Sequence, residues 1–217
     1  MLDGAEGHHA ADVMRLRVGE WLLLCDGRGG TASAVVQTVG RGRLELSIVE
    51  RRYLDPPAPR LVVAQAIAKG DRGELAVQAM TEAGVDEIVP WRALRSIARW
   101  KDDRALERWR VVAREAAKQA RRAWLPVVSP PSSTGALAAR VTFVLHEEAT
   151  ARLSTVELPA APEIVLVVGP EGGVAPEELA VFVAAGAVPV RLGDTVLRTS
   201  TAGVAALSVL SARLGRW

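Results

Sequence analysis

From residue 60 onward, short apolar runs alternate with helical patterns, and this alternation constrains the fold more than any other feature. The run RLVVAQAI (60–67) is typical of a buried strand. The segment 71–84 is typical of a helix, with Asp71 as its N-cap and Gly84 just after its end. A second strand, DEIVPW (86–91), follows and is expected to end at Pro90. Together they predict a β-α-β unit.

The carboxyl half continues the same pattern. We expect strands within 140–148, 163–169 and 188–193, and helices over 176–186 and 200–215. Pro176 suits the first turn of its helix, and Gly186 suits the position after its end. Strands that alternate with helices predict an α/β domain in which helices cover both faces of a parallel sheet.

The first 55 residues have a different pattern. Three apolar runs between residues 20 and 52 are separated by glycine-rich turns at 26–30 and 40–42, which predicts a small antiparallel sheet or barrel. The segment DPPAP (55–59) is a stiff linker, because three prolines cannot continue a strand ladder. We therefore expect two domains, residues 1–57 and 58–217.

Composition excludes several classes of protein. The single cysteine cannot form an intramolecular disulfide, and three histidines argue against a zinc site, so we expect no metal. The start of the chain is acidic and lacks the apolar run of a secretory signal, and no stretch is apolar over the roughly 20 residues that a bilayer requires. A cytoplasmic protein without a membrane partner is expected.

Residues 100–124 predict an amphipathic helix. On a helical projection one side carries Leu106, Trp109, Ala113, Ala116, Ala120 and Trp124, and the other carries Arg104, Arg108, Arg114, Lys118 and Arg122. A basic face of this kind either keeps a surface helix solvated or contacts RNA, and both interpretations stay open.

The turn VGPEGG (168–173) follows a predicted strand. It lacks the Gly-Lys-Ser/Thr ending of a P-loop and the register of the dinucleotide fingerprint. Glu171 would repel a phosphate, so a ligand here is expected to be neutral or cationic, such as an adenosyl sulfonium. The alternative is a tight turn with an exposed glutamate.

The segment LGDTVLRTSTAG (192–203) joins a strand to a helix capped by Thr199, Ser200 or Thr201. Arg198 stands just before the helix, where the dipole does not favour a cation. It is therefore expected either to meet a ligand or to pair with Asp194. His146 lies at the carboxyl end of a predicted parallel strand, where α/β sheets bind ligands.

Several segments together resemble the ribosomal RNA small subunit methyltransferase E family. They are HHAADVMRLRVGE (8–20), CDGRGG (25–30), KGDRGELAVQAMTEAGVDEIVPW (69–91), EAAKQARRAWLP (115–126), VVGPEGGVAPEE (167–178) and VRLGDTVLRTSTAGVAAL (190–207). The resemblance implies transfer of a methyl group from S-adenosylmethionine to the ring N3 of a uridine in 16S ribosomal RNA. The alternative is a catalytically silent RNA-binding or ribosome-assembly factor of the same fold.

The resemblance also implies an architecture. It places a PUA-like β-barrel that binds RNA in residues 1–57 and a SPOUT α/β domain with a trefoil knot in residues 58–217, and it implies a homodimer. The family has a further strand before the motif that begins at His8, so we expect the barrel to lack its first strand.

The resemblance carries over to individual residues. The implied walls of the cofactor pocket are Leu145, His146, Val168, Gly169, Gly172, Gly173, Leu192, Gly193, Leu197, Arg198 and Thr201. The expected RNA-binding residues are His9, Arg15, Lys69, Arg72, Arg95 and Arg122, joined by Arg114 and Lys118 of the basic helix. Arg198 is expected to stabilise the uridinate, and Glu171 or solvent to remove the proton. Ser200 stands where the family has a carboxylate.

Overall fold

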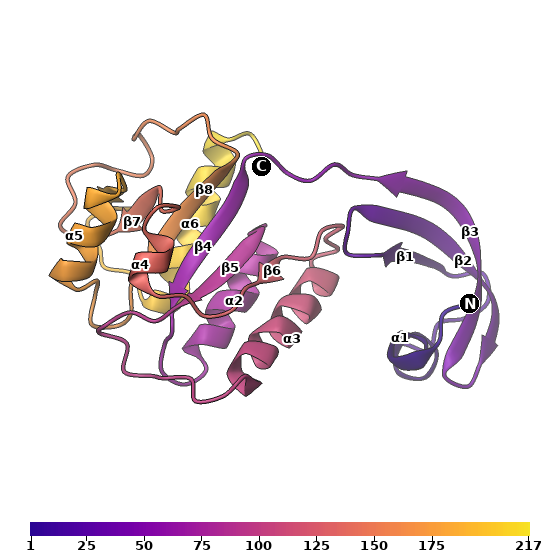
Figure 1. Ribbon diagram of the computed structural model, residues 1–217. Coiled ribbons are helices and arrows are strands. Elements are labelled where there is room, and N and C mark those ends of the chain that lie inside the picture. Colours follow the sequence, from indigo (N-terminus) through magenta and orange to yellow (C-terminus); the bar gives the residue numbers. More distant parts are fainter. The chain divides into compact units, whose positions relative to one another are not determined.

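The computed structural model describes residues 1–217 and divides into two compact units (Figure 1). The first unit consists of Met1–Pro56 together with Arg121–Trp124. The second consists of Pro57–Ala120 and Leu125–Trp217. None of the helices is both long and apolar enough to span a membrane.

The first unit is built on an antiparallel sheet in the order β1-β2-β3. Its strands are β1 (Trp21–Cys25), β2 (Gly30–Gly40) and β3 (Arg43–Tyr53), which confirms the three predicted strands. A short helix, α1 (Gly4–His8), and a π-helical turn, η1 (His9–Val13), precede them. Ala10 and Ala11 pack with Val36 and Leu44 to form the core of this unit.

Trp124 belongs to the first unit and not to the basic helix, which corrects the helical projection. Its Nε1 donates a hydrogen bond to the carbonyl of Leu54 at 2.9 Å, and its ring meets Tyr53 edge-on with centroids 6.2 Å apart. Gly29 donates its N–H to the carbonyl of Ala123 at 3.0 Å. A Cβ on Gly29 would lie 2.8 Å from the Trp124 ring, so glycine is required there.

The second unit contains a six-stranded parallel sheet, in the order β6-β5-β4-β8-β7-β9. The strands are β4 (Arg60–Ala66), β5 (Glu87–Trp91), β6 (Val127–Val128), β7 (Phe143–Leu145), β8 (Glu163–Val168) and β9 (Val188–Val190). The predicted parallel α/β domain is confirmed. The strands β7 and β9 are shorter than their apolar patterns, because the chain leaves the sheet at Leu145 and Val190 to form loops.

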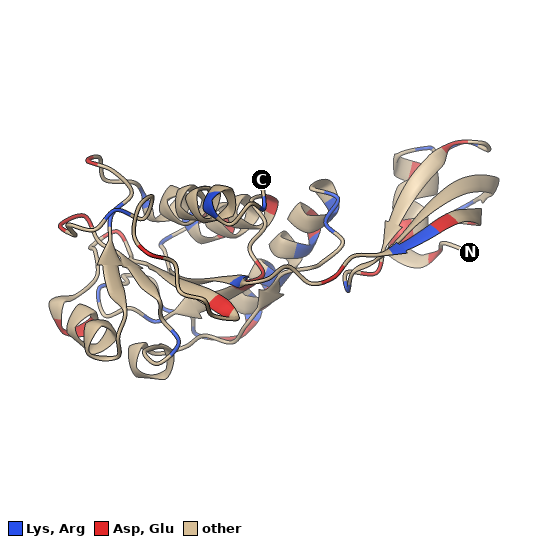
Figure 2. Cartoon of the chain, turned by 90° about the horizontal axis from the view of Figure 1, so that it is seen from above, with Lys and Arg blue, Asp and Glu red and all other residues tan.

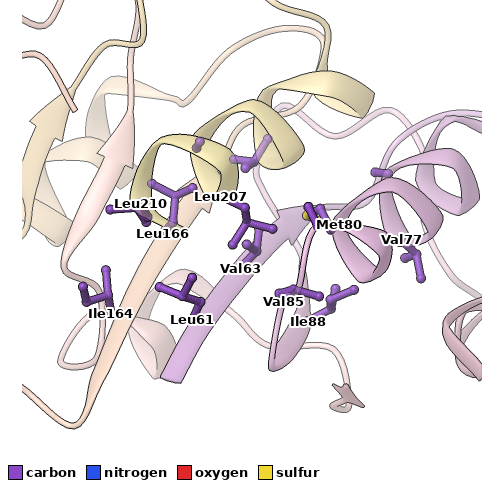
Figure 3. Close-up of a cluster of buried hydrophobic side chains, with 14 of the residues drawn as sticks. Leu61, Val63, Val77, Met80, Val85, Ile88, Ile164, Leu166, Leu207 and Leu210 are labelled. Carbon is purple, nitrogen blue, oxygen red and sulfur yellow. The ribbon is translucent and has the colours of Figure 1, made fainter. Parts of the chain in front are cut away.

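Helices cover both faces of this sheet, as predicted. On one face lie α2 (Arg72–Glu82), α3 (Arg104–Gln119) and α6 (Thr199–Arg213); on the other lie α4 (Thr134–Leu137) and α5 (Pro176–Ala184). Side chains of β4 alternate between the two cores, with Leu61 and Val63 in the first and Val62 and Ala64 in the second. Figure 3 shows the first core, where Met80 of α2 and Leu207 of α6 point toward the strands.

Three predicted element boundaries were wrong. Pro90 lies inside β5. Its carbonyl accepts a hydrogen bond from the N–H of Ser132, which lies beyond the end of β6. The N–H that proline lacks would face the same edge of β5, where no strand is paired with it, so proline is tolerated at this position. The basic helix ends at Gln119, and Ala120 is exposed. The N-cap of α6 is Arg198, with no side-chain capping hydrogen bond, in place of the predicted Thr199, Ser200 or Thr201.

A network of charged side chains joins the amino ends of the central strands. Glu87, whose side chain is 9% exposed, accepts from Arg140 at 3.1 Å, Arg60 at 3.0 Å and the Ser129 hydroxyl at 2.7 Å. Arg140 also donates twice to Glu163. Burial raises the pKa of the Glu87 carboxyl, but the hydrogen bonds from Ser129 and Arg140 and the charges of Arg140 and Arg60 outweigh it and hold the pKa below its ordinary value of 4.5.

We expect Arg140→Met to lower the free energy of unfolding by about 1–3 kcal/mol at pH 7, because it removes charge-assisted hydrogen bonds from a buried carboxylate. A lowered pKa contributes stability that is fully present above about pH 4.5 and is lost as the pH falls through the folded-state value. Urea unfolding at pH 7 and below pH 4.5 should therefore show the deficit shrinking in acid. The control is Arg104→Met, which removes an 89% exposed partner of Asp102 and should change little. A deficit that did not depend on pH would contradict this assignment.

Candidate functional site

A pocket of about 430 Å³ lies at the carboxyl ends of β8, β7 and β9, within the second unit. This is the edge at which open parallel sheets bind ligands. Its walls are the strand end 145–147, the turn 168–171 with 173–174, the loop 190–193 with 195–199, and the side chains of Arg72 and Ala202. The volume lies in the range typical of small-molecule sites.

The glycine turn after β8 forms one wall. Gly173 has φ +74° and donates its N–H to the carbonyl of Pro170 at 2.9 Å, which closes the turn. Arg95 fastens the turn through its Nη1, which donates to the carbonyl of Gly172 at 3.0 Å. Gly172 itself does not line the pocket, so the structure does not place this predicted cofactor residue in the wall.

Glu171 lines the pocket with its side chain 24% exposed. Its Oε1 accepts from Arg72 Nη1 at 3.4 Å and from the backbone N–H of Lys69 at 3.3 Å. Two residues predicted to bind RNA thus contact the predicted catalytic carboxylate. Glu171 is therefore not merely an exposed turn residue, because its contacts with Lys69 and Arg72 connect the turn to the start of α2.

Arg198 also lines the pocket and is exposed. The structure gives its guanidinium no hydrogen bond and no ion pair. The alternative that it pairs with Asp194 is wrong, because Asp194 instead contacts Arg191 at 3.1 Å and Arg152 at 3.5 Å. A cation at the N-terminus of a helix opposes the helix dipole. The position of Arg198 therefore favours a negatively charged or strongly polar ligand group.

Most predicted cofactor residues meet in this pocket. Those in its walls are Leu145, His146, Val168, Gly169, Gly173, Leu192, Gly193, Leu197 and Arg198. Thr201 is outside the wall, because it faces solvent on the first turn of α6 and donates its hydroxyl to the carbonyl of Arg198. His146 accepts at Nδ1 from the N–H of Glu148 at 3.3 Å, which assigns the proton of the neutral ring to Nε2.

The predicted RNA-binding residues belong to both units. Lys69, Arg72 and Arg95 lie beside the glycine turn. Arg114 and Lys118 are exposed on α3, along which Lys and Arg recur (Figure 2). His9, Arg15 and Arg122 belong to the first unit.

Sequence reasoning missed several residues of the site. Glu147, Arg191 and Val174 line the pocket. Gln65 lies beneath it, buried in β4, and donates to Thr199, which in turn donates to the carbonyl of Gly169. The only signal for Gln65 was an amide inside an otherwise apolar strand. No group of three or more His, Cys, Asp or Glu side chains is placed to hold a metal ion.

Comparisons with known proteins agree with this geometry. Residues 56–211 match the family model described as an RNA methyltransferase domain, and residues 2–49 match that of an RNA methyltransferase PUA domain. The chain is 47% identical to the ribosomal RNA small subunit methyltransferase E of Mycobacterium bovis, over 100% of this chain and 87% of the relative.

Two solved structures are similar over nearly the whole chain. A methyltransferase from Legionella pneumophila, solved with bound SAM, is 30% identical with a TM-score of 0.84, and the match covers 98% of this chain and 90% of that one. The ribosomal RNA small subunit methyltransferase E of Neisseria gonorrhoeae, bound to S-adenosyl methionine, is 28% identical with a TM-score of 0.85, covering 94% and 88%. The predicted fold, a parallel α/β domain after a PUA domain, is confirmed.

Proposed function

Because this chain belongs to the ribosomal RNA small subunit methyltransferase E family, we propose that it transfers a methyl group from S-adenosylmethionine to the ring N3 of a uridine in 16S ribosomal RNA. The family supplies the reaction class, which is methylation of ribosomal RNA with S-adenosylmethionine as the donor. The alternative of a catalytically silent factor is not favoured. What we add as a proposal is the acceptor atom, the ring N3 of a uridine. Work on ribosomal RNA would take place in the cytoplasm.

The residues of the pocket fit the methyl donor. Its glycine-rich walls at Gly169, Gly173 and Gly193 let backbone groups approach a flat ring closely. Glu147 and Glu171 bring carboxylates to a site that must hold a cationic cofactor. S-adenosylmethionine, when bound, supplies an electrophilic methyl group on a sulfonium. The protein's contribution is to hold donor and acceptor in line and to keep water away.

The proposal depends chiefly on one observation, which is that Arg198 lines the pocket with no partner inside the protein. A uridine N3 must lose its proton to become a nucleophile, and a nearby cation stabilises the negative charge that develops on the ring. Arg198 lines the pocket without a partner inside the protein. Ser200, buried in the first turn of α6, carries no carboxylate, so the proton passes to Glu171 or to solvent.

We also propose how the chain divides its roles. Residues 1–57 would bind RNA, with His9 and Arg15 among the contacting residues, and residues 58–217 would carry the reaction. The homodimer and the trefoil knot follow from the family resemblance and remain predictions.

Nucleoside mass analysis of 16S ribosomal RNA tests the proposal. RNA from cells that lack the protein should lack one N3-methyluridine, and one fragment should be lighter by the mass of one methyl group. Purified protein with S-adenosylmethionine should restore that mass. An unchanged nucleoside profile would contradict the proposal, and a methyl group on another atom would keep the reaction class and overturn the acceptor.

A further inference from the structure

We propose that Gln65 is a positioning residue, which acts through Thr199 to fix the carbonyl of Gly169 and the first turn of α6 that follows Arg198. The inference rests on the proposed function, because it assigns a residue to the same pocket. Gln65 does not line the pocket itself.

Gln65 is an amide in an apolar layer. Its exposed fraction is 0%, and its neighbours in β4, Ala64 and Ala66, are equally buried. A buried amide is costly unless it forms hydrogen bonds. Its Nε2 donates to the hydroxyl of Thr199 at 3.0 Å, with the carbonyls of Thr199 and Ala66 at 3.3 Å each.

The direction of these hydrogen bonds is determined by their acceptors. The Thr199 hydroxyl donates its own hydrogen to the carbonyl of Gly169 at 2.8 Å, so toward Gln65 it can only accept. The carbonyls of Ala66 and Thr199 also accept only. A flipped amide would place Oε1 against three acceptors. The relay therefore runs from the Gln65 amide to the Thr199 hydroxyl and then to the Gly169 carbonyl.

Gln65 has an energetic cost to the core, because one of its polar atoms is buried and unpaired. Gln65 Oε1 is buried without a hydrogen-bond partner. Replacing a buried polar group and its partner by apolar groups of similar shape is often close to neutral for stability. Apolar residues at positions 65 and 199 together would thus cost the core little, and the amide–hydroxyl pair points to a requirement for geometry at the pocket.

Three separate segments meet at this relay. Gln65 comes from β4, Gly169 from the end of β8, and Thr199 from the start of α6. Gly169 and Thr199 both line the pocket, and Arg198 is the N-cap that directly precedes Thr199. The relay therefore sets the distance between the glycine turn and Arg198, the two walls between which donor and acceptor would lie.

The next turn of α6, at Gly203, is also closely packed. A Cβ on Gly203 would lie 2.6 Å from Met80 Sδ and 3.4 Å from Gln65 Oε1. Met80 belongs to α2, so glycine at position 203 allows α6 to pack closely against α2, with the Gln65 side chain in ordinary contact beside it.

The test uses paired variants of the full chain. Gln65→Met keeps the size of the side chain and removes the donor, and Thr199→Val removes the hydroxyl. Each is expected to lower kcat by about 10- to 100-fold, as a small misplacement of reacting groups does. Thr199→Ser restores the hydroxyl and should recover most of the turnover lost in Thr199→Val. Because both residues act in one relay, the double variant should be no slower than the slower single variant.

Two further measurements separate positioning from folding. In the protein without ligand, backbone hydrogen exchange of residues 199–203 should be faster in Gln65→Met than in the wild type. Val63→Ala, in the same strand, should lower the thermal midpoint yet keep kcat per folded molecule. Unchanged exchange, effects that multiply in the double variant, or kcat losses that follow only the folded fraction would overturn the proposal. If the proposed function itself were wrong, the wild-type protein would transfer no methyl group, which is a different result from any of these.

Discussion

Replacing Arg198 by alanine is expected to lower the rate of methyl transfer by about 10²- to 10³-fold, the usual effect of removing one group that stabilises transition-state charge. The guanidinium lines the pocket, is exposed, and has no partner within the protein. Its charge is therefore available to a uridine that is losing its N3 proton. Affinity for S-adenosylmethionine should stay within about threefold, because a group that acts only in the transition state adds little to ground-state binding.

Single-turnover methylation and calorimetric titration with S-adenosylmethionine measure the two quantities separately. Arg198→Lys keeps the charge and should recover part of the lost rate. Arg152→Ala is the matched control: it removes an arginine that contacts Asp194 of the same loop but does not line the pocket. Unchanged turnover in Arg198→Ala would refute the role. Equal losses of turnover and cofactor affinity would assign Arg198 to cofactor binding instead.

The architecture of the second unit could be predicted because its signals are local. Alternating apolar runs and helical patterns are properties of neighbouring residues, and Pro176 and Gly186 mark the ends of α5 where expected. Trp124 could not be placed in the same way. The chain leaves the helix after Gln119, and Arg121 adopts φ +54°, so the angular projection loses its meaning beyond that point.

The site was predictable only as separate pieces. Glycines and a helix start indicated the turn after β8 and the loop before α6. Their meeting depends on strand order, and no local pattern shows that β7 lies between β8 and β9. Contacts such as Gln65 with Thr199, and Arg72 with Glu171, join residues 134 and 99 positions apart. The chemistry of each side chain could be read in advance, but its partner could not.

The basic face of α3 is expected to bind RNA phosphates. Its Arg114 and Lys118 are exposed. Arg104 and Arg108, also on α3, form ion pairs with Asp102 and Glu74. Arg114 also lines a surface hollow of about 300 Å³ beside Leu125 and Val127, two exposed apolar residues that suit contact with a ribose or a base.

The double variant Arg114→Gln/Lys118→Gln is expected to weaken binding of 16S ribosomal RNA by about 10- to 100-fold at low salt. Each lost phosphate contact lowers the slope of log affinity against log salt by about 0.7–0.9, so two contacts should lower it by about 1.5. Filter binding at several salt concentrations measures both quantities.

Net charge alone must be excluded as the cause, because any protein that becomes less positive binds RNA more weakly. Ala180→Glu/Ala184→Glu, at exposed positions of α5, changes the net charge from +2 by the same two units without touching α3. This variant should bind with a nearly unchanged salt slope. If both variants lost the same slope, α3 would be only a solvated face. If only the α3 variant lost it, α3 carries part of the RNA-binding surface.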